Sequence, residues 1–205
     1  MHQVERNFLH GQNVYVHELV TGASCGFWWV GEKNWEGIPS ALMQCGTPRN
    51  YFVFDFTEKD YSFRYKGIGM DASRQMNIWI AGIDSTDVYI DELRNKPQGE
   101  MLVTVYGASD STIVRCRLDN GEWLLCEKKQ EELDVNVARV RSWNQLKIYP
   151  TRFNRRNPFR RQFSPQIWGL QLPKECCEGV HLIAVEASDQ WGFKASGERC
   201  FYYQR

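Results

Sequence analysis

Few residues of this chain stand in patterns that carry chemistry. The four histidines are His2, His10, His17 and His181, and no spacing pairs one of them with a nucleophile. His17 and His181 lie in segments that alternate as strands do, so we interpret both as structural. No Gly-x-Ser-x-Gly elbow and no P-loop occurs. The residues alone therefore nominate no catalytic group.

The seven cysteines offer a second kind of chemistry. None stands in a Cys-x-x-Cys pair, and the adjacent Cys176 and Cys177 are poorly spaced to ligate one zinc ion. The odd count leaves at least one thiol unpaired within the chain. We expect most of the cysteines to be small, buried, apolar side chains.

A tryptophan cluster is the first candidate binding surface. Trp28, Trp29 and Trp35 lie in a glycine-rich stretch. Such residues fill a core or a domain interface, or they stack against a sugar. We favour the core or interface, because large aromatic side chains dominate both environments.

A basic segment is the second candidate. Eight basic residues and no acid lie from Arg139 to Arg161, with aromatic residues among them. Pro150 and Pro158 oppose a long helix, so we predict a loop. The loop either binds a polyanion or pairs its arginines with acids, and the neutral net charge favours pairing. The partner acids considered are Glu131, Glu132 and Asp134, and the candidate anion-binding residues are Arg152, Arg155, Arg156, Arg160 and Arg161.

The elements that must position these side chains are mostly strands. Alternating or β-prone segments occur at 14–19, 51–56, 61–65, 76–80, 102–106, 112–118, 180–187 and 199–203. The clearest hairpin turns at Asp119-Asn120-Gly121, where Asn-Gly would supply the positive φ of a type I′ turn. Residues 128–143 have room for a helical turn or two. The pattern predicts an all-β fold, an immunoglobulin-like or fibronectin-like β-sandwich.

Length and composition narrow the class of protein. The 205 residues suit one large domain, or one domain and a fragment of another. With 42% apolar and 24% charged residues, a disordered chain is excluded, and no apolar run could span a membrane. The balance of 25 Lys and Arg against 25 Asp and Glu excludes a globally basic nucleic-acid binder. The polar opening shows no signal peptide.

Short motifs then follow one another in an order that resembles a known family. They are Cys25-Gly26-Phe27-Trp28-Trp29, Glu36-Gly37-Ile38-Pro39, Met43-Gln44-Cys45-Gly46-Thr47-Pro48, Gln75-Met76-Asn77-Ile78-Trp79, Ile167-Trp168, Leu172-Pro173, Gly179-Val180-His181 and Glu186-Ala187-Ser188-Asp189. From about Cys25 to Tyr203, the chain resembles the C-terminal domain attached to calcineurin-like metallophosphoesterases of the Bacteroides group.

Two positions depart from the pattern of that family, which usually reads Asp-Gly-Thr-Pro-x-Gly-Tyr. Asn50 stands where the family has glycine, and we expect a left-handed backbone there, because asparagine tolerates it best. Cys45 stands where the family has an acid, so no role of that acid carries over.

The resemblance also gives the first residues a meaning. Calcineurin-like phosphoesterases end their metal-ligand series with Gly-His-x-His, and Met1-His2 matches the last two residues. The resemblance implies that His2 belongs to an incomplete metal site. Residues 1–24 would be the closing strands of a phosphoesterase domain, and residues 25–205 its C-terminal β-sandwich accessory domain. Without their sheet partners, residues 1–21 should be mobile or pair elsewhere.

The implied function is accessory. The parent would hydrolyse phosphoesters with two divalent metal ions. This chain lacks the Asp-x-His, Gly-Asp-x-x-Asp and Gly-Asn-His motifs, so we expect no catalysis and no cofactor of its own. Its partner would be the catalytic domain, on which it packs, with Trp28 and Trp29 at the junction and the substrate entrance shaped by the contact. The alternative is a module that binds a glycan or a polyanion. The resemblance implies a periplasmic or secreted parent and leaves the localisation of this chain open.

Overall fold

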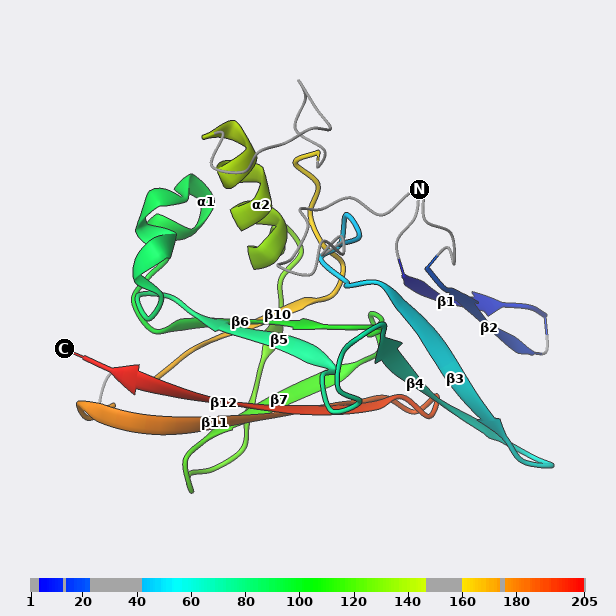
Figure 1. Cartoon of the computed structure of the whole chain (residues 1–205). Coiled ribbons are helices and arrows are strands. Elements are labelled where there is room, and N and C mark those ends of the chain that lie inside the picture. Colours follow the sequence, from blue (N-terminus) through cyan, green and yellow to red (C-terminus); the bar gives the residue numbers. More distant parts are fainter. Residues whose placement is uncertain (1–3, 13, 23–41, 147–159, 174–175, 205) are drawn as a thin grey trace.

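Two four-stranded antiparallel sheets pack face to face, and helices cover the outer face of the first sheet (Figure 1). The computed structural model describes residues 4–12, 14–22, 42–146, 160–173 and 176–204. The predicted all-β sandwich is confirmed.

The first sheet has its strands in the order β5-β6-β10-β9, and all three pairings are antiparallel. Its strands are β5 (Met76–Ile80), β6 (Glu100–Val105), β10 (Ile167–Gln171) and β9 (Glu127–Lys128). Alternate residues of β5 and β6 therefore face the second sheet and the helices in turn.

The second sheet has the order β12-β11-β7-β8 and the longest strands. Its strands are β12 (Lys194–Tyr203), β11 (Gly179–Ser188), β7 (Ile113–Leu118) and β8 (Leu124–Leu125). The pairing of β11 with β12 runs from Gly179 opposite Tyr203 to Ser188 opposite Lys194.

Two further hairpins lie at one end of the sandwich (Figure 1). Strand β1 (Glu5–His10) pairs with β2 (Tyr15–Val20), and β3 (Asn50–Phe56) pairs with β4 (Tyr61–Gly67). Among the described residues, β1 and β2 pair only with each other. Strand β4 reaches the sandwich through a bridge between Phe63 and Phe193.

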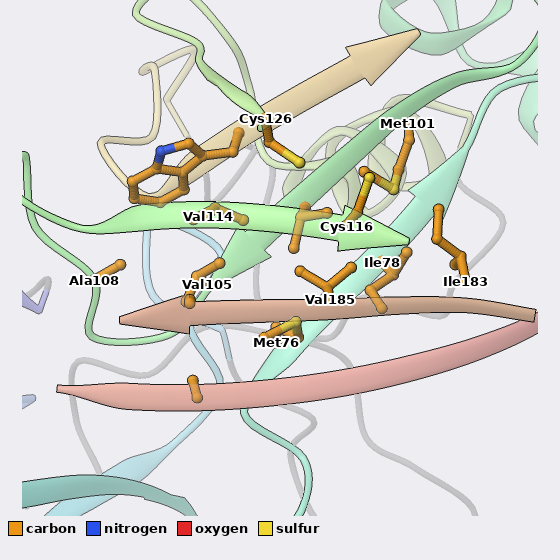
Figure 2. Packing of buried hydrophobic residues seen from close by; sticks show 14 of the residues in the cluster. Met76, Ile78, Met101, Val105, Ala108, Val114, Cys116, Cys126, Ile183 and Val185 are labelled. Atoms are coloured by element: carbon orange, nitrogen blue, oxygen red, sulfur yellow. The ribbon is translucent and has the colours of Figure 1, made fainter. Parts of the chain in front are cut away.

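The main core lies between the two sheets (Figure 2). Met76 and Ile78 of β5 face Ile183 and Val185 of β11, and all four are buried. Cys116 and Cys126 are part of this core. Four of the cysteines that the structure describes are buried, as expected for most of them, and two are exposed; the buried ones are Cys45, Cys116, Cys126 and Cys176.

A second core lies between the first sheet and the helices. The helical segments are η1 (Ser85–Tyr89), α1 (Asp91–Arg94) and α2 (Val135–Gln145). Trp79 and Leu102 pack here against Leu93 of α1 and Val137 of α2. Within the described ranges, no helix is long and apolar enough to cross a membrane.

Two local predictions were wrong. The hairpin at Asp119 forms, but the positive φ falls on Asp119, at 50°, rather than on Asn120 and Gly121. The Asp119 carboxylate accepts the backbone N–H of Leu182 at 2.8 Å, which fixes the turn one residue earlier. Asn50 does not have the expected left-handed backbone: it opens β3, opposite Gly67.

Candidate functional site

Most of the predicted site residues lie outside the described part of the chain. These are His2, Trp28, Trp29, Trp35, Arg152, Arg155 and Arg156. Arg160 and Arg161 are described and exposed. The backbone of Arg160 is held by the side chain of Gln44, and Arg161 lies over the ring of Phe163 at 5.6 Å.

The segment from Arg139 to Arg161 was predicted to be a loop, but its first residues, up to Gln145, belong to α2. Arg139 lies in α2, and its guanidinium pairs with Asp84 at 2.9 Å and with Asp87 at 2.8 Å. Pairing with acids was predicted, and Arg139 is paired, but with Asp84 and Asp87 instead of Glu131, Glu132 or Asp134. Asp134 instead accepts the backbone N–H groups of the first turn of α2 and is fully buried.

The described ranges contain no group of three or more His, Cys, Asp or Glu side chains that could hold a metal ion. A dinuclear site needs several carboxylate and imidazole ligands around two cations. The residues described here do not fit such a site, so no step of phosphoester hydrolysis is assigned to them.

The two hairpins carry exposed apolar side chains on both faces, because neighbours such as Tyr15 and Val16 of β2 point to opposite faces of a strand. We call this set of side chains the hairpin surface. It consists of Leu9, Val14, Tyr15, Val16, Val20, Tyr51, Phe54 and Phe56. Val16 is 52% exposed and Phe56 is 76% exposed. Phe54 and Phe56 stack with ring centroids 5.9 Å apart. This number of exposed apolar side chains on two neighbouring hairpins makes the hairpins a candidate interaction site.

A buried ion pair fastens β1 and β2 to the sandwich. The Arg6 guanidinium donates to Asp189 Oδ2 at 2.7 Å and to the Gly107 carbonyl at 3.2 Å. Both charged side chains are 0% exposed. The guanidinium also lies 4.6 Å from the Phe63 ring centroid and 5.1 Å from that of Phe193. The hairpin is therefore held by a charge pair that spans 183 positions of sequence.

His17 completes this junction from β2. Its Nε2 accepts the Nε–H of Arg6 at 3.2 Å, so the neutral ring carries its proton on Nδ1 and donates it to the Tyr61 hydroxyl. The imidazole stacks on Phe8 at 4.7 Å, and Phe8 stacks on Trp191 at 4.7 Å. Burial lowers the pKa of His17, the charge of Arg6 lowers it further, and Asp189 opposes both. The surroundings of His17 therefore favour its neutral form, which accepts the hydrogen bond from Arg6.

We expect the stability of the chain to fall as His17 becomes protonated. Because the pKa of His17 is lowered below its ordinary 6.5, the unfolded chain binds more protons between the two pKa values. The stabilisation by neutral His17 is therefore full above pH 6.5 and is lost as pH falls through that window. Urea unfolding from pH 8 to about pH 5 should show this decline, and His17→Gln, which keeps an acceptor for Arg6, should flatten it.

His181 provides the control, because its pKa shifts in the opposite direction. Its Nδ1 bonds to Asp119 at 2.8 Å, which raises the pKa, so its contribution is present below 6.5 and is lost as pH rises. His181→Gln should leave the acidic decline in place. An acidic decline that survives His17→Gln and disappears in His181→Gln would contradict the assignment.

The motif around Cys45 forms a buried polar network that also reaches Val4, the residue before β1. Thr47 contacts the Cys45 thiol at 3.2 Å and donates to Gln166 at 2.8 Å, and Gln166 donates to the Val4 carbonyl at 3.0 Å. Ser164 donates to the Cys45 carbonyl at 2.8 Å. Burial raises the pKa of the Cys45 thiol, so it remains protonated and structural.

Sequence reasoning missed the residues that make the junction. Arg6 lies in a polar segment without a motif, and nothing near it in sequence names Asp189 as its partner. Asp189 did stand in the motif series, and its carboxylate accepts the N–H groups of Trp191 and Phe193. The sequence therefore pointed to the turn at Asp189, but it did not indicate that Arg6 is the partner of this carboxylate.

Comparison with known proteins gives one match. A family model described as the C terminal of calcineurin-like phosphoesterase matches residues 18–194. The matched range begins within β2 and ends at the first residue of β12, so it includes the second hairpin, the helices and the strands from β5 to β11, but not β1. No curated protein and no solved structure matches the chain.

Proposed function

We propose an accessory, non-catalytic role for this chain, which belongs to the family of C-terminal domains of calcineurin-like phosphoesterases. In this role the sandwich docks through the hairpin surface onto a calcineurin-like catalytic domain and shapes the entrance to its active site. The hydrolysis of phosphoesters and the two divalent metal ions belong to that catalytic domain.

The hairpin surface is the observation that carries the proposal. Its eight large apolar side chains lie on two-stranded sheets at one end of the sandwich. A two-stranded sheet leaves backbone N–H and C=O groups unpaired along its outer edges, which a partner strand can use. The buried ion pair of Arg6 and Asp189 holds the first hairpin against the sandwich, and the bond between His17 and Tyr61 joins it to the second hairpin. A surface that is held in place loses less entropy on docking.

The docking is tested by binding to a calcineurin-like catalytic domain from the same genome, produced separately. We expect the double variant Val16→Glu, Phe56→Glu, which places one charge on each hairpin, to weaken binding at least about tenfold in calorimetry, because a charge buried in an interface costs more than about 1.4 kcal/mol. The added wild-type chain should also change the KM of the catalytic domain for a chromogenic phosphoester.

The control is the double variant Val88→Glu, Val180→Glu. These two side chains are 56% and 75% exposed, but they lie outside the hairpin surface. Binding weakened by the control and kept by the hairpin variant would reject the docking surface. Turnover by the chain alone with manganese, well above that of His2→Ala, would reject the non-catalytic role.

The role of residues 1–24 as closing strands of a phosphoesterase domain, with His2 as a metal ligand, is part of the same proposal. Codons for Gly-His directly upstream of Met1, with Gly-Asn-His and Gly-Asp-x-x-Asp further back, would support it. The alternative function as a glycan- or polyanion-binding module depends mainly on residues outside the described ranges and stays a prediction.

A further inference from the structure

A cavity of about 860 Å³ opens where β5 and β12 meet at the edge of the sandwich. These are edge strands of the two different sheets, and they approach each other there (Figure 1). Arg199 of β12 donates to the Ile78 carbonyl of β5 at 2.7 Å. Gly197 allows this approach, since a Cβ at that position would lie 2.8 Å from Met76 Cγ. The volume lies in the range of sites for small molecules.

Arginines line this cavity without matching carboxylates. Arg74, Arg117 and Arg199 all face it, and no ion pair within the described part of the chain includes any of them. A fourth, Arg139, is occupied by Asp84 and Asp87. Partly buried guanidinium groups are normally paired, so Arg117 and Arg199, which are partly buried, leave a position for an anion beside the exposed Arg74.

Arg199 is the clearest case. Within the described part of the chain, its guanidinium donates to a neutral carbonyl, that of Ile78, and not to a carboxylate. Partial burial lowers the pKa of Arg199, and the neighbouring charge of Arg139 lowers it further, against the opposing effect of Asp84 and Asp87. The positive charges are thus crowded here, and an added anion would relieve the crowding.

Two buried hydrogen-bond donors in the cavity lining also lack acceptors. Arg117 Nε and Asn77 Nδ2 are buried and have no partner among the residues that the structure describes. The Arg117 guanidinium is covered by the Trp123 ring at 4.9 Å. A buried donor without an acceptor is unfavourable, and an oxyanion bound beside these groups would supply an acceptor.

The acids in the lining do not balance this charge. They are Asp84, Glu186 and Glu198. Asp84 is engaged by Arg139, and Glu186 is engaged by Arg115 at 2.6 Å. Only Glu198 remains to face the three arginines.

We propose that this cavity binds a small organic phosphate, whose phosphoryl oxygens accept hydrogen bonds from Arg117 and Arg199 and whose organic part lies towards Trp123. Arginine suits this role because its planar fork matches tetrahedral oxyanions in two-point contacts. Arg74, which is exposed, supplies a third positive charge at the cavity. The proposal is independent of the accessory role, since none of these residues belongs to the hairpin surface.

Calorimetry on the full chain with AMP, inorganic phosphate and adenosine tests the site. We expect AMP and phosphate to bind with a Kd below about 1 mM, AMP more tightly, and adenosine not to bind. Arg117→Gln and Arg199→Gln should each weaken AMP binding at least about tenfold, and added salt should weaken it further.

Two further variants keep the test decisive. Arg74→Gln removes an exposed charge and should weaken binding even if Arg199→Gln fails to fold. Arg64→Gln is the matched control, because Arg64 is exposed and pairs with Asp55 on the hairpins. Absence of binding by both AMP and phosphate, adenosine binding as tightly as AMP, or equal binding by all four variants would overturn the proposal.

Discussion

Replacing Arg6 by methionine should lower the free energy of unfolding by about 3–5 kcal/mol, the cost of breaking a buried ion pair from one side. Asp189 would keep a 0% exposed side chain without its cation. His17 Nε2 and the Gly107 carbonyl would each lose a donor. Urea unfolding monitored by tryptophan fluorescence measures the change.

An exposed ion pair provides the matched control. Arg64 and Asp55 approach to 2.6 Å, yet both side chains are 60% exposed. Arg64→Met should therefore cost less than about 1 kcal/mol, because solvent screens exposed pairs.

The double variant Arg6→Met, Asp189→Asn separates the pair from its surroundings. Removing both charges should cost clearly less than the sum of the two single changes. Each single variant leaves one buried charge unpaired, whereas the double variant leaves none. Equal losses in Arg6→Met and Arg64→Met, or additive losses in the double variant, would show that the Arg6 pair does not anchor the hairpin.

Local pattern was sufficient for most of the strands. The alternation at Met76–Ile80 predicted β5 with its bounds, because one face packs between the sheets and the other under the helices. The local pattern did not predict strand β1, because Arg6, Asn7 and His10 make its sequence polar. Arg6 is buried in β1 only because Asp189 lies beside it, and a sequence window cannot show that contact.

The candidate site depended even more on tertiary structure. Phe54 and Phe63 face each other across β3 and β4, and both come from aromatic, β-prone segments. Phe63 is 3% exposed because it lies against the sandwich, whereas Phe54 is 36% exposed. Propensity treats the two alike, so the hairpin surface could not be read from residue types. The resemblance supplied the family, and the structure supplied the surface.

Gly46→Ala should be the second severe change, with a loss of about 2–5 kcal/mol from overpacking and from a left-handed backbone. Gly46 has φ of +88°, and a Cβ there would lie 2.0 Å from Asp134 Cγ. Asp134 cannot retreat easily, because it accepts from Thr104 at 2.6 Å and caps α2 through the N–H of Val137 at 3.0 Å. Displacing it would leave the first turn of α2 without its cap.

Gly69→Ala measures the cost of a left-handed alanine without the contact that a Cβ at Gly46 would make with Asp134. Gly69 has φ of +73°, but a Cβ there would meet nothing within 4 Å. Its replacement should cost only about 1–2 kcal/mol, the penalty of a left-handed residue. The difference between the two variants in urea unfolding measures the Asp134 contact, and loss of helical circular dichroism in Gly46→Ala alone would locate it at α2. Equal losses of unfolding free energy in the two variants would mean that Asp134 moves aside at little cost. In that case the glycine would be required by the turn alone, and the buried carboxylate would not explain it.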